Sequence, residues 1–354
     1  MIVIMSDPHL GTNRGANTTV ASRQHLKQTL FKQLDNNLST YNGPGVTKII
    51  AGDLFDKDTN DEAAILQGLQ VMRKCDVILA GNHDLPNRAN KVSTVQLLDE
   101  LSGCDGTVVI PPVGGVRIEQ GAAKCGTNIT LIPHHATQQL FDEAIQAALN
   151  NPIGGLVITH CNFDSDRATH DDASLNMPRE QAQQLLDAGY EYILNGHEHA
   201  HSTHLGGRFV NLGNTYPTSM GDISDKYLWT YTHGKLEKHL IWDAHMGYAE
   251  IEISGEPSEW PTPNIHSEFV DLVGTIAPEH GPELAEYVTR WFAAMERLMV
   301  RNRVGYTTDI LVSEASQGSV IHDLEGQISA DLSGSDLGEL WNYYRAGVSG
   351  CTAG

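Results

Sequence analysis

The feature that most constrains this chain is a short apolar segment followed at once by a polar cluster, a pattern that recurs along its first 199 residues. The segments that precede polar groups are residues 2–5, 46–51, 77–80, 156–159 and 190–194. Short, bounded apolar runs of this kind are typical of strands that are buried on both faces. Open α/β sheets place ligand sites beyond the carboxyl ends of their strands. We therefore expect the polar clusters to meet in space.

Helical patterns separate these strands. The expected helices cover about residues 22–38, 61–74 and 179–188. Strands that alternate with helices predict an α/β fold. We therefore assign residues 1–245 to one α/β catalytic domain.

The sequence changes in character after residue 245. Residues 248–253 alternate like a strand, residues 283–300 have helical spacing with one apolar face, and residues 306–312 form another candidate strand. We predict a small α+β domain over 246–330. The tail, 331–354, contains a possible partner-docking helix with Leu337, Leu340, Trp341 and Tyr344, and packing of this helix onto its own domain is the alternative.

The charge is strongly negative and unevenly spread. The net charge is −21, with 18 basic and 26 acidic residues in 1–240 but 5 and 18 in 241–354. A chain this acidic is therefore not expected to hold nucleic acid by long-range attraction alone. A polyanionic substrate has to be captured locally, by metal ions or with help from a partner.

Other features of the sequence concern the cellular compartment. No apolar run reaches the roughly 18 residues of a membrane span, and the N-terminus lacks the pattern of a secretory signal. The five cysteines are an odd number without a C-x-x-C pair. We expect a cytoplasmic protein that makes no contact with a membrane.

The clusters supply carboxylate oxygen, imidazole nitrogen and amide oxygen, a mixed set that suits manganese, iron or zinc better than calcium. The candidate metal ligands are Asp7, His9, Asp53, Asn82, His160, His197 and His199. Asp53 can bridge two ions, since a carboxylate has two oxygens. Two ions about 3.5–4 Å apart can activate a water molecule and stabilise an in-line displacement at a phosphate. A nearby histidine can then protonate the leaving oxygen.

Glycines stand directly before three of these groups, at Gly52, Gly81 and Gly196. A residue without Cβ lets the backbone turn sharply and approach the ligands closely. His197 and His199 are two residues apart, so on an extended segment their side chains point the same way. We expect them to serve the same metal cluster.

Taken together, these clusters resemble the signature of the calcineurin-like metallophosphoesterase superfamily. More narrowly, the segments 6–11, 52–56, 196–199 and 211–215 resemble SbcD-type DNA repair nucleases, with the pair Leu10-Gly11 favouring this branch. The resemblance implies a four-layer α/β/β/α sandwich followed by a small α+β capping domain. The compact length is similar to that of phage-encoded forms, which act in the host cytoplasm.

The resemblance also implies residue roles. One ion would be held by Asp7, His9, Asp53 and His199, and the other by Asp53, Asn82, His160 and His197. His83 would be the general acid, and Asp84 would orient it. The implied metal is manganese, with iron, zinc and magnesium as alternatives. Asp56 is a candidate supporting residue, and His134, His135, His170, His201 and His204 are expected to be polar loop residues, although His201 or His204 could touch a substrate phosphate.

The implied function is a DNA exonuclease and endonuclease subunit that works with an SbcC-like coiled-coil ATPase. The sequence has no Walker A pattern, because its one Gly-Lys pair, Gly234-Lys235, is followed by leucine, so the partner has to supply ATP hydrolysis. The resemblance further implies a homodimer through a segment that contains Val92, Val95, Leu97, Leu98 and Leu101, and burial in their own core is the alternative. Other functions are a phosphodiesterase or phosphatase for nucleotides, cyclic nucleotides or phosphoproteins, and a non-catalytic scaffold.

Overall fold

The computed structural model describes residues 1–12, 20–86, 91–102, 107–165, 175–262, 267–290 and 299–307. The chain divides into two compact units, Met1–Gly305 and Tyr306–Gly354. The predicted tail, 331–354, and residues 308–330 of the predicted capping domain lie outside the described residues.

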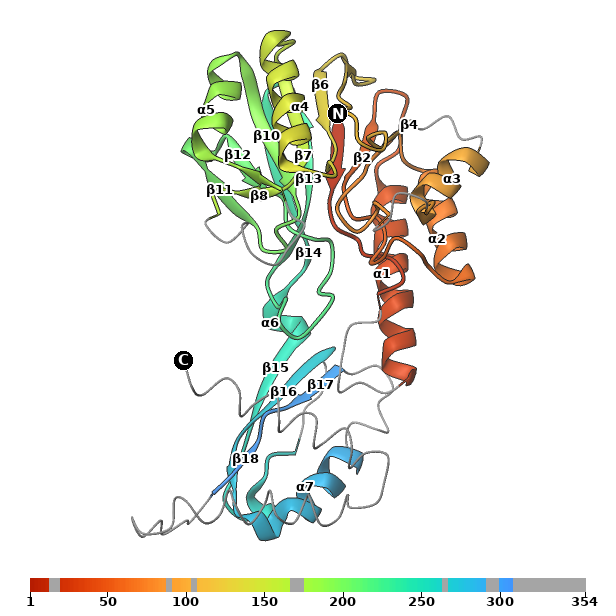
Figure 1. Ribbon diagram of the computed structural model, residues 1–354. Coiled ribbons are helices and arrows are strands. Elements are labelled where there is room, and N and C mark those ends of the chain that lie inside the picture. Colours follow the sequence, from red (N-terminus) through yellow and green to blue (C-terminus); the bar gives the residue numbers. More distant parts are fainter. Residues whose placement is uncertain are drawn as a thin grey trace, which may run out of the picture. The chain divides into compact units, whose positions relative to one another are not determined.

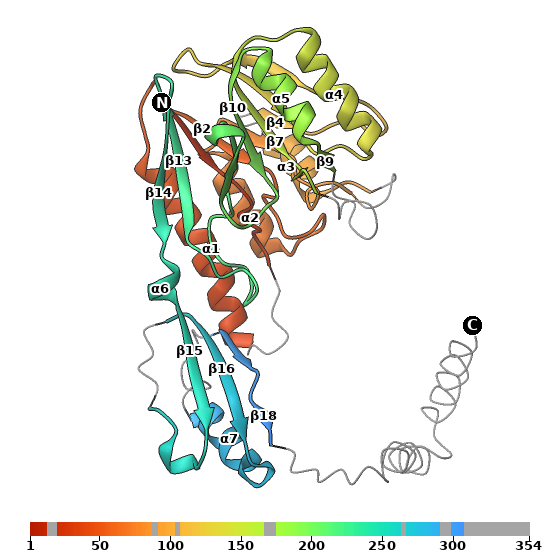
Figure 2. The same cartoon turned by 90° about the vertical axis from the view of Figure 1, so that its left-hand side faces the viewer.

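The first sheet has the order β14-β13-β1-β2-β3-β4. Its parallel strands are β1 (Ile2–Met5), β2 (Thr47–Ala51), β3 (Val77–Leu79) and β4 (Thr107–Val109). The antiparallel pair β13 (Lys226–Thr232) and β14 (Lys235–Trp242) extends the sheet beside β1, as Figure 2 shows. The chain thus returns to its first strand after forming the whole second sheet.

The second sheet has the order β11-β12-β10-β7-β6-β5. Its parallel strands are β6 (Asn128–Ile132), β7 (Gly155–His160), β10 (Tyr190–Gly196) and β12 (Phe209–Asn211). The edge strands β5 (Glu119–Ala122) and β11 (Ser202–His204) are antiparallel to their neighbours. A separate small pair is formed by β8 (Asn162–Phe163) and β9 (Asn176–Met177).

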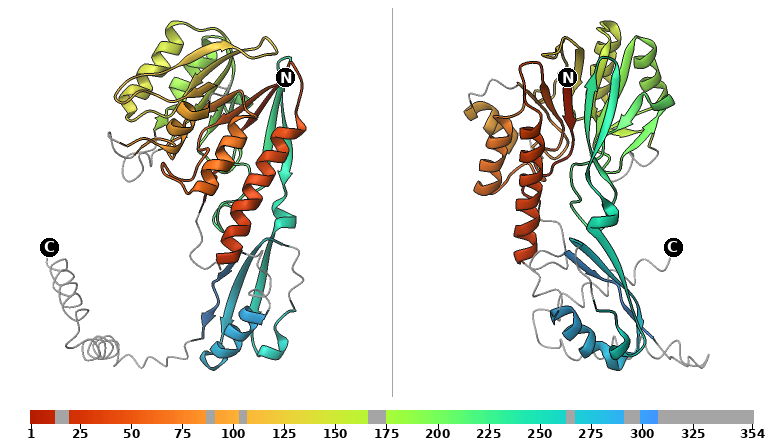
Figure 3. Two further views of the ribbon diagram at one scale, coloured as in Figure 1. Left: turned by 90° about the vertical axis from the view of Figure 1, so that its right-hand side faces the viewer. Right: turned by 180° about the vertical axis from the view of Figure 1, so that it is seen from behind.

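Helices cover the outer face of each sheet (Figures 1 and 3). The first sheet packs against α1 (Val20–Thr40), α2 (Glu62–Met72) and α3 (Thr94–Ser102). The second packs against α4 (Gln138–Asn150) and α5 (Arg179–Asp187). The 3-10 turn η1 (Leu205–Gly207) joins β11 to β12.

Alternation along the central strands explains the layers. Ile2 and Ile4 of β1 lie in the core between the sheets with Leu156, whereas Val3 and Met5 lie in the core under the helices. Both faces of the strand are covered, so every residue of β1 is apolar and buried. The predicted α/β/β/α sandwich is confirmed.

A smaller parallel sheet follows. Its parallel strands are β15 (Tyr248–Ser254), β16 (Phe269–Ile276) and β17 (Met299–Asn302), and a fourth strand, β18 (Gly305–Tyr306), also pairs with β16. The remaining elements are α6 (Ala244–Gly247), η2 (Pro257–Glu259), η3 (Pro278–His280) and α7 (Gly281–Val288). The predicted domain boundary at 245/246 falls inside α6, and the division into domains stays a prediction.

The prediction of a helix over 283–300 is wrong at its C-terminal end. Met299 and Val300 begin β17, where Met299 pairs with Phe269 and Val300 with Val270. Their side chains lie in two different apolar clusters, one on each side of the sheet. Pairing with β16 therefore decides the conformation here, against a helical spacing of apolar residues.

One apolar cluster joins this sheet to the preceding part of the chain. It contains Leu26, Leu30, Tyr216, Trp242, Phe269 and Met299. Tyr216 and Trp242 also donate hydrogen bonds to the carboxylate of Glu268. Within the described residues, no helix combines the length and the apolar character needed to span a membrane.

Candidate metal centre

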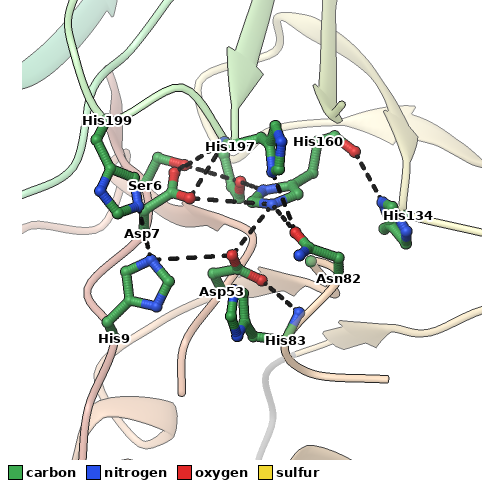
Figure 4. A network of polar contacts seen from close by, with 12 residues as sticks. Ser6, Asp7, His9, Asp53, Asn82, His83, His134, His160, His197 and His199 are labelled. Carbon is green, nitrogen blue, oxygen red and sulfur yellow. Dashed lines mark hydrogen bonds and ion pairs between the residues drawn. The ribbon is translucent and has the colours of Figure 1, made fainter. Parts of the chain in front are cut away.

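The predicted site residues lie together where the strands of both sheets end (Figure 4). From the first sheet come Asp7 and His9 after β1, Asp53 after β2, and Asn82 and His83 after β3. From the second come His160 at the end of β7, and His197 and His199 after β10. The site is deep, because Asp7, His9 and His160 are 0% exposed and Asp53 is 1% exposed. The sandwich thus brings groups distant in sequence into one buried cluster.

The backbone at the site is strained. Asp7, His9, Asp53 and His197 have φ angles of 51°, 46°, 49° and 81°, in a region that residues with a Cβ rarely adopt. The loops are held in this form by each other: the amide of Asp7 donates to the carbonyl of Gly52 at 3.1 Å, and that of His9 to the carbonyl of Asp53 at 3.1 Å. Such strain persists only where the surrounding structure fixes it, and it clusters at functional sites.

The three glycines are required by close approach, as predicted. A Cβ at Gly52 would overlap the ring of His160, and one at Gly81 would overlap the carboxylate of Asp53. A Cβ at Gly196 would collide with the carbonyl of Ala51. Any larger residue at these positions would displace a candidate ligand.

One group of candidate ligands comprises Asp7, His9 and His199. The Nε2 atoms of the two imidazoles are 2.9 Å apart. On the far side of each ring, Nδ1 of His199 lies 3.2 Å from a carboxylate oxygen of Asp222, and Nδ1 of His9 lies 3.6 Å from one of Asp56. At 3.2 Å the carboxylate of Asp222 can accept from Nδ1 of His199, which keeps the ring proton there and leaves a lone pair on Nε2. A lone pair that faces a second imidazole and the carboxylate of Asp7 suits a cation at this point.

The second group comprises Asp53, His160 and His197. Nδ1 of His160 donates to the carbonyl of Ala51 at 2.9 Å, so in the neutral ring Nε2 carries the lone pair. That Nε2 lies 3.4 Å from Oδ2 of Asp53 and 3.1 Å from Oδ1 of Asn82, which are both acceptors. Nδ1 of His197 lies 3.1 Å from the same amide oxygen. Acceptors again face one another around a common point.

Asp53 lies between the two groups. Its Oδ2 is 3.9 Å from Nε2 of His9 and 3.4 Å from Nε2 of His160. Its other oxygen accepts a hydrogen bond from the amide of His83 at 2.9 Å. One oxygen that faces both groups is the arrangement expected of a ligand that two ions share.

The electrostatics show the same excess of acceptors. Burial alone would lower the pKa of His160, but the carboxylates of Asp53 and Asp7 outweigh it and raise the pKa to about 10. Burial raises the pKa of Asp7, whereas for Asp53 the facing His160 overcomes burial and holds the pKa low. Positive charge is needed at this point, from protons or from divalent cations. The nitrogen and oxygen donors present fit manganese, iron or zinc.

His83 also forms a candidate metal-holding group with His9 and Asp53, and its ring contacts another residue than Asp84. Nδ1 of its half-buried ring lies 2.8 Å from the carbonyl oxygen of Asp56. The carboxylate of Asp84 accepts instead from the amides of Leu54, Phe55 and Gly81, at 3.2, 3.2 and 3.0 Å. Burial raises the pKa of Asp84 to about 7. Asp84 therefore fixes the loops after β2 and β3, and Asp56 holds the ring of His83.

Two histidines that we expected to be polar loop residues are buried. His134 is 3% exposed, with its ring centroid 6.3 Å from that of His160, and burial lowers its pKa to about 3. His135 is fully buried. Both follow β6, so the pattern of a strand and then a polar group could have revealed them. His201 and His204 bond to Asn211 and Ser202, and His170 lies outside the described residues.

The fold and the site define a metal-dependent phosphoesterase. A model of the calcineurin-like phosphoesterase family matches residues 1–201, more than half of the chain, and the chain belongs to this family. Its members are phosphoester hydrolases that bind two divalent metal ions.

No curated protein matches the chain. Among solved structures, the chain is similar to a Staphylococcus aureus protein with a provisional 5′-nucleotidase assignment, determined in complex with α-ketoglutarate. The sequences are 10% identical, and the TM-score is 0.38. The match covers 68% of this chain and 52% of that one, so this chain spans about half the length of its neighbour.

Proposed function

We propose that this protein is a metal-dependent nuclease that hydrolyses phosphodiester bonds in DNA with two divalent ions, most favourably manganese. The observation that carries the hydrolytic part is the convergence of imidazole lone pairs on Asp7 and Asp53 at the meeting point of both sheets. The choice of DNA as substrate is supported by the motifs that resemble SbcD-type nucleases.

The residues divide into ligands and a proton donor. Asp7, His9, Asp53 and His199 would hold one ion, and Asp53, Asn82, His160 and His197 the other. Bound ions would activate water and stabilise charge on the phosphate. The carbonyl of Asp56 holds Nδ1 of His83, which leaves Nε2 to meet the substrate and protonate the leaving oxygen.

The pair Leu10-Gly11, which favours the SbcD-type branch, has a structural role in shaping this site. Leu10 is fully buried, and its amide donates to the carbonyl of Leu54 at 2.9 Å. Gly11 has a φ of 79° and leaves no room for a Cβ beside Asn60 and Ala64. The pair therefore docks the loop after β1 onto the loop after β2. This role does not identify the substrate, so the choice of DNA is tested separately.

That test compares turnover on linear double-stranded DNA, single-stranded DNA, a cyclic nucleotide, a 5′-nucleotide and a phosphopeptide, with manganese present. We expect DNA to be cleaved fastest, with products that carry free hydroxyl and phosphate ends. Faster turnover of a nucleotide or phosphopeptide would contradict the nuclease and support the alternative phosphodiesterase or phosphatase. Turnover of none of these substrates would support the scaffold.

We further propose an SbcC-like ATPase as partner, which would also supply positive surface for DNA. The candidate docking helix in 331–354 lies outside the described residues. Deletion of residues 334–354 is expected to preserve cleavage of short DNA and to abolish co-purification with the ATPase. Unchanged co-purification contradicts this assignment.

Dimerisation is proposed through α3 and the residues before it. Val95 and Leu98 are 1% and 2% exposed and belong to the core, whereas Val92, Leu97 and Leu101 are 65%, 41% and 70% exposed. Part of the apolar set is therefore available to a second copy of the chain. Leu101→Glu is expected to shift the molar mass measured by light scattering from dimer to monomer, and a monomeric wild-type chain contradicts the proposal.

A further inference from the structure

A buried carboxylate lies directly behind one of the candidate ligands. Asp222 is in the turn that precedes β13, and its side chain is 8% exposed. Its Oδ2 lies 3.2 Å from Nδ1 of His199. Asp222 is distant from His199 in the sequence, and no motif marks it.

The other contacts of Asp222 fix the carboxylate in place. Oδ1 accepts from Nζ of Lys226 at 2.6 Å. Oδ2 accepts from the side-chain amide of Asn214 at 2.5 Å and from the backbone amide of Thr218 at 3.1 Å. Because donors hold the carboxylate from several directions, it cannot turn away from His199.

Lys226 also holds the backbone of His199 in place. The side chain of this lysine is 0% exposed, and its Nζ also donates to Oγ of Ser224 at 3.0 Å and to the backbone carbonyl of His199 at 3.3 Å. The three hydrogens of the ammonium group thus have three acceptors, which a buried charge requires. Through these bonds, one lysine holds both the main chain of His199 and the carboxylate behind its ring.

We propose that Asp222 and Lys226 form a positioning pair that fixes the tautomer and orientation of His199 and thereby sets the affinity for one of the two ions. The proposal rests on the proposed two-metal function. A carboxylate that accepts from Nδ1 keeps the lone pair on Nε2 and makes that nitrogen a stronger ligand. The ion concerned is the one that His199 would hold with Asp7 and His9.

The second ion would be supported differently. Nδ1 of His160 donates to the backbone carbonyl of Ala51, an uncharged acceptor that no side-chain substitution removes. The two ions therefore differ in their dependence on Asp222, and a change at Asp222 separates them. A merely structural role of Asp222 would affect both ions alike.

The test is a calorimetric titration with Mn²⁺ of the full chain, stripped of metal beforehand, as wild type and as Asp222→Asn. We expect one dissociation constant to rise by about 10–100-fold, the usual effect of losing such a supporting group, and the other to change by less than about twofold. Asp271→Asn is the matched control, since it also removes a buried carboxylate that is paired with cations, and both constants should stay as in wild type.

A second variant removes the risk that an unpaired ammonium prevents folding. Asp222→Asn combined with Lys226→Met deletes both charges together, and we expect the same selective loss of affinity. Unchanged constants in a variant that unfolds cooperatively, or an equal rise in both, would overturn the positioning role. Failure of the wild type to bind two Mn²⁺ ions would instead overturn the proposed function.

Discussion

Two regions of this molecule hold buried carboxylates that are neutralised in two different ways. In the small C-terminal sheet, Asp271 is fully buried, and two arginines meet it, with Nε of Arg301 at 3.0 Å and Nε of Arg303 at 3.1 Å from the same oxygen. At the end of the sandwich strands, Asp7 and Asp53 are equally buried but face imidazoles. Asp271 therefore faces permanent positive charges, whereas Asp7 and Asp53 face imidazoles whose charge depends on protonation.

The two regions differ in whether the group that faces the carboxylate can give up its proton. A guanidinium group stays protonated under all ordinary conditions, so the two arginines compensate the negative charge of Asp271 without a metal ion. An imidazole can give up its proton near neutral pH and offer a lone pair to a metal ion. The backbone differs too: among the described residues from 244 to 307, none other than glycine has a positive φ, whereas four candidate ligands do. Of these two regions, the metal centre is the one that combines backbone strain with exchangeable charge.

The largest effect should come from His83, which we assign to proton transfer and not to metal binding. His83→Ala should lower the rate of DNA cleavage by a factor of about 10²–10⁴, the usual contribution of a general acid. The affinity for Mn²⁺ should stay as in wild type. Steady-state rates and a metal titration on the same preparation check both points.

The matched control for this prediction is His245→Ala, which removes an exposed histidine from α6. It should leave the rate of cleavage unchanged. A variant at His83 that cleaves as fast as the control would remove His83 from the mechanism.

A smaller effect is expected in the other region. Asp271→Asn should lower the free energy of unfolding by about 1–2 kcal/mol, because hydrogen bonds between charged groups are lost while the arginines stay partly hydrated. Cleavage should continue at the wild-type rate. Urea denaturation and an activity assay test this, and a large loss of activity would show that the two regions are not independent.

The smallest effect concerns pH. His135 donates from Nδ1 to the carbonyl of Pro133 at 2.8 Å and accepts at Nε2 from the amide of Arg117 at 3.1 Å, and burial lowers its pKa. The unfolded chain therefore binds a proton below a pH of about 6.5, where the folded chain does not, so this contribution to stability is present above that pH and is lost on acidification.

Urea denaturation of the chelator-treated protein between pH 7.5 and 5 measures this dependence. His135→Gln should unfold with a shallower pH dependence than wild type over this range, because it removes the group that the unfolded chain protonates more readily. An unchanged slope would show that His135 can take up its proton in the folded state.

Much of the sandwich could be predicted, for a physical reason. Central strands buried on both faces need continuous apolar residues, so residues 2–5 and 156–159 are recognisable without neighbours. The candidate ligands follow these strands directly, so predicting the strands also pointed to the ligands. Edge strands such as β14 are largely exposed and lack such a signal.

The rest of the site depends on contacts between distant segments. Asp222 meets His199 only because the chain returns to β1 as β13, and nothing local marks that return. Likewise, a backbone carbonyl, that of Asp56, holds His83, and a backbone group has no sequence signature. The sequence thus indicated the candidate ligands that the fold brings together, whereas the groups that orient them could not be predicted from it.

The central claim is that the two buried carboxylates at the sandwich are completed by two divalent ions that share Asp53. The most direct test is the number of Mn²⁺ ions bound per chain, measured by equilibrium dialysis and elemental analysis on the metal-stripped protein and on Asp53→Asn. We expect two ions in wild type and loss of tight binding at both positions in the variant. Wild type that binds no Mn²⁺, or Asp53→Asn that still binds two ions with unchanged affinity, would contradict it.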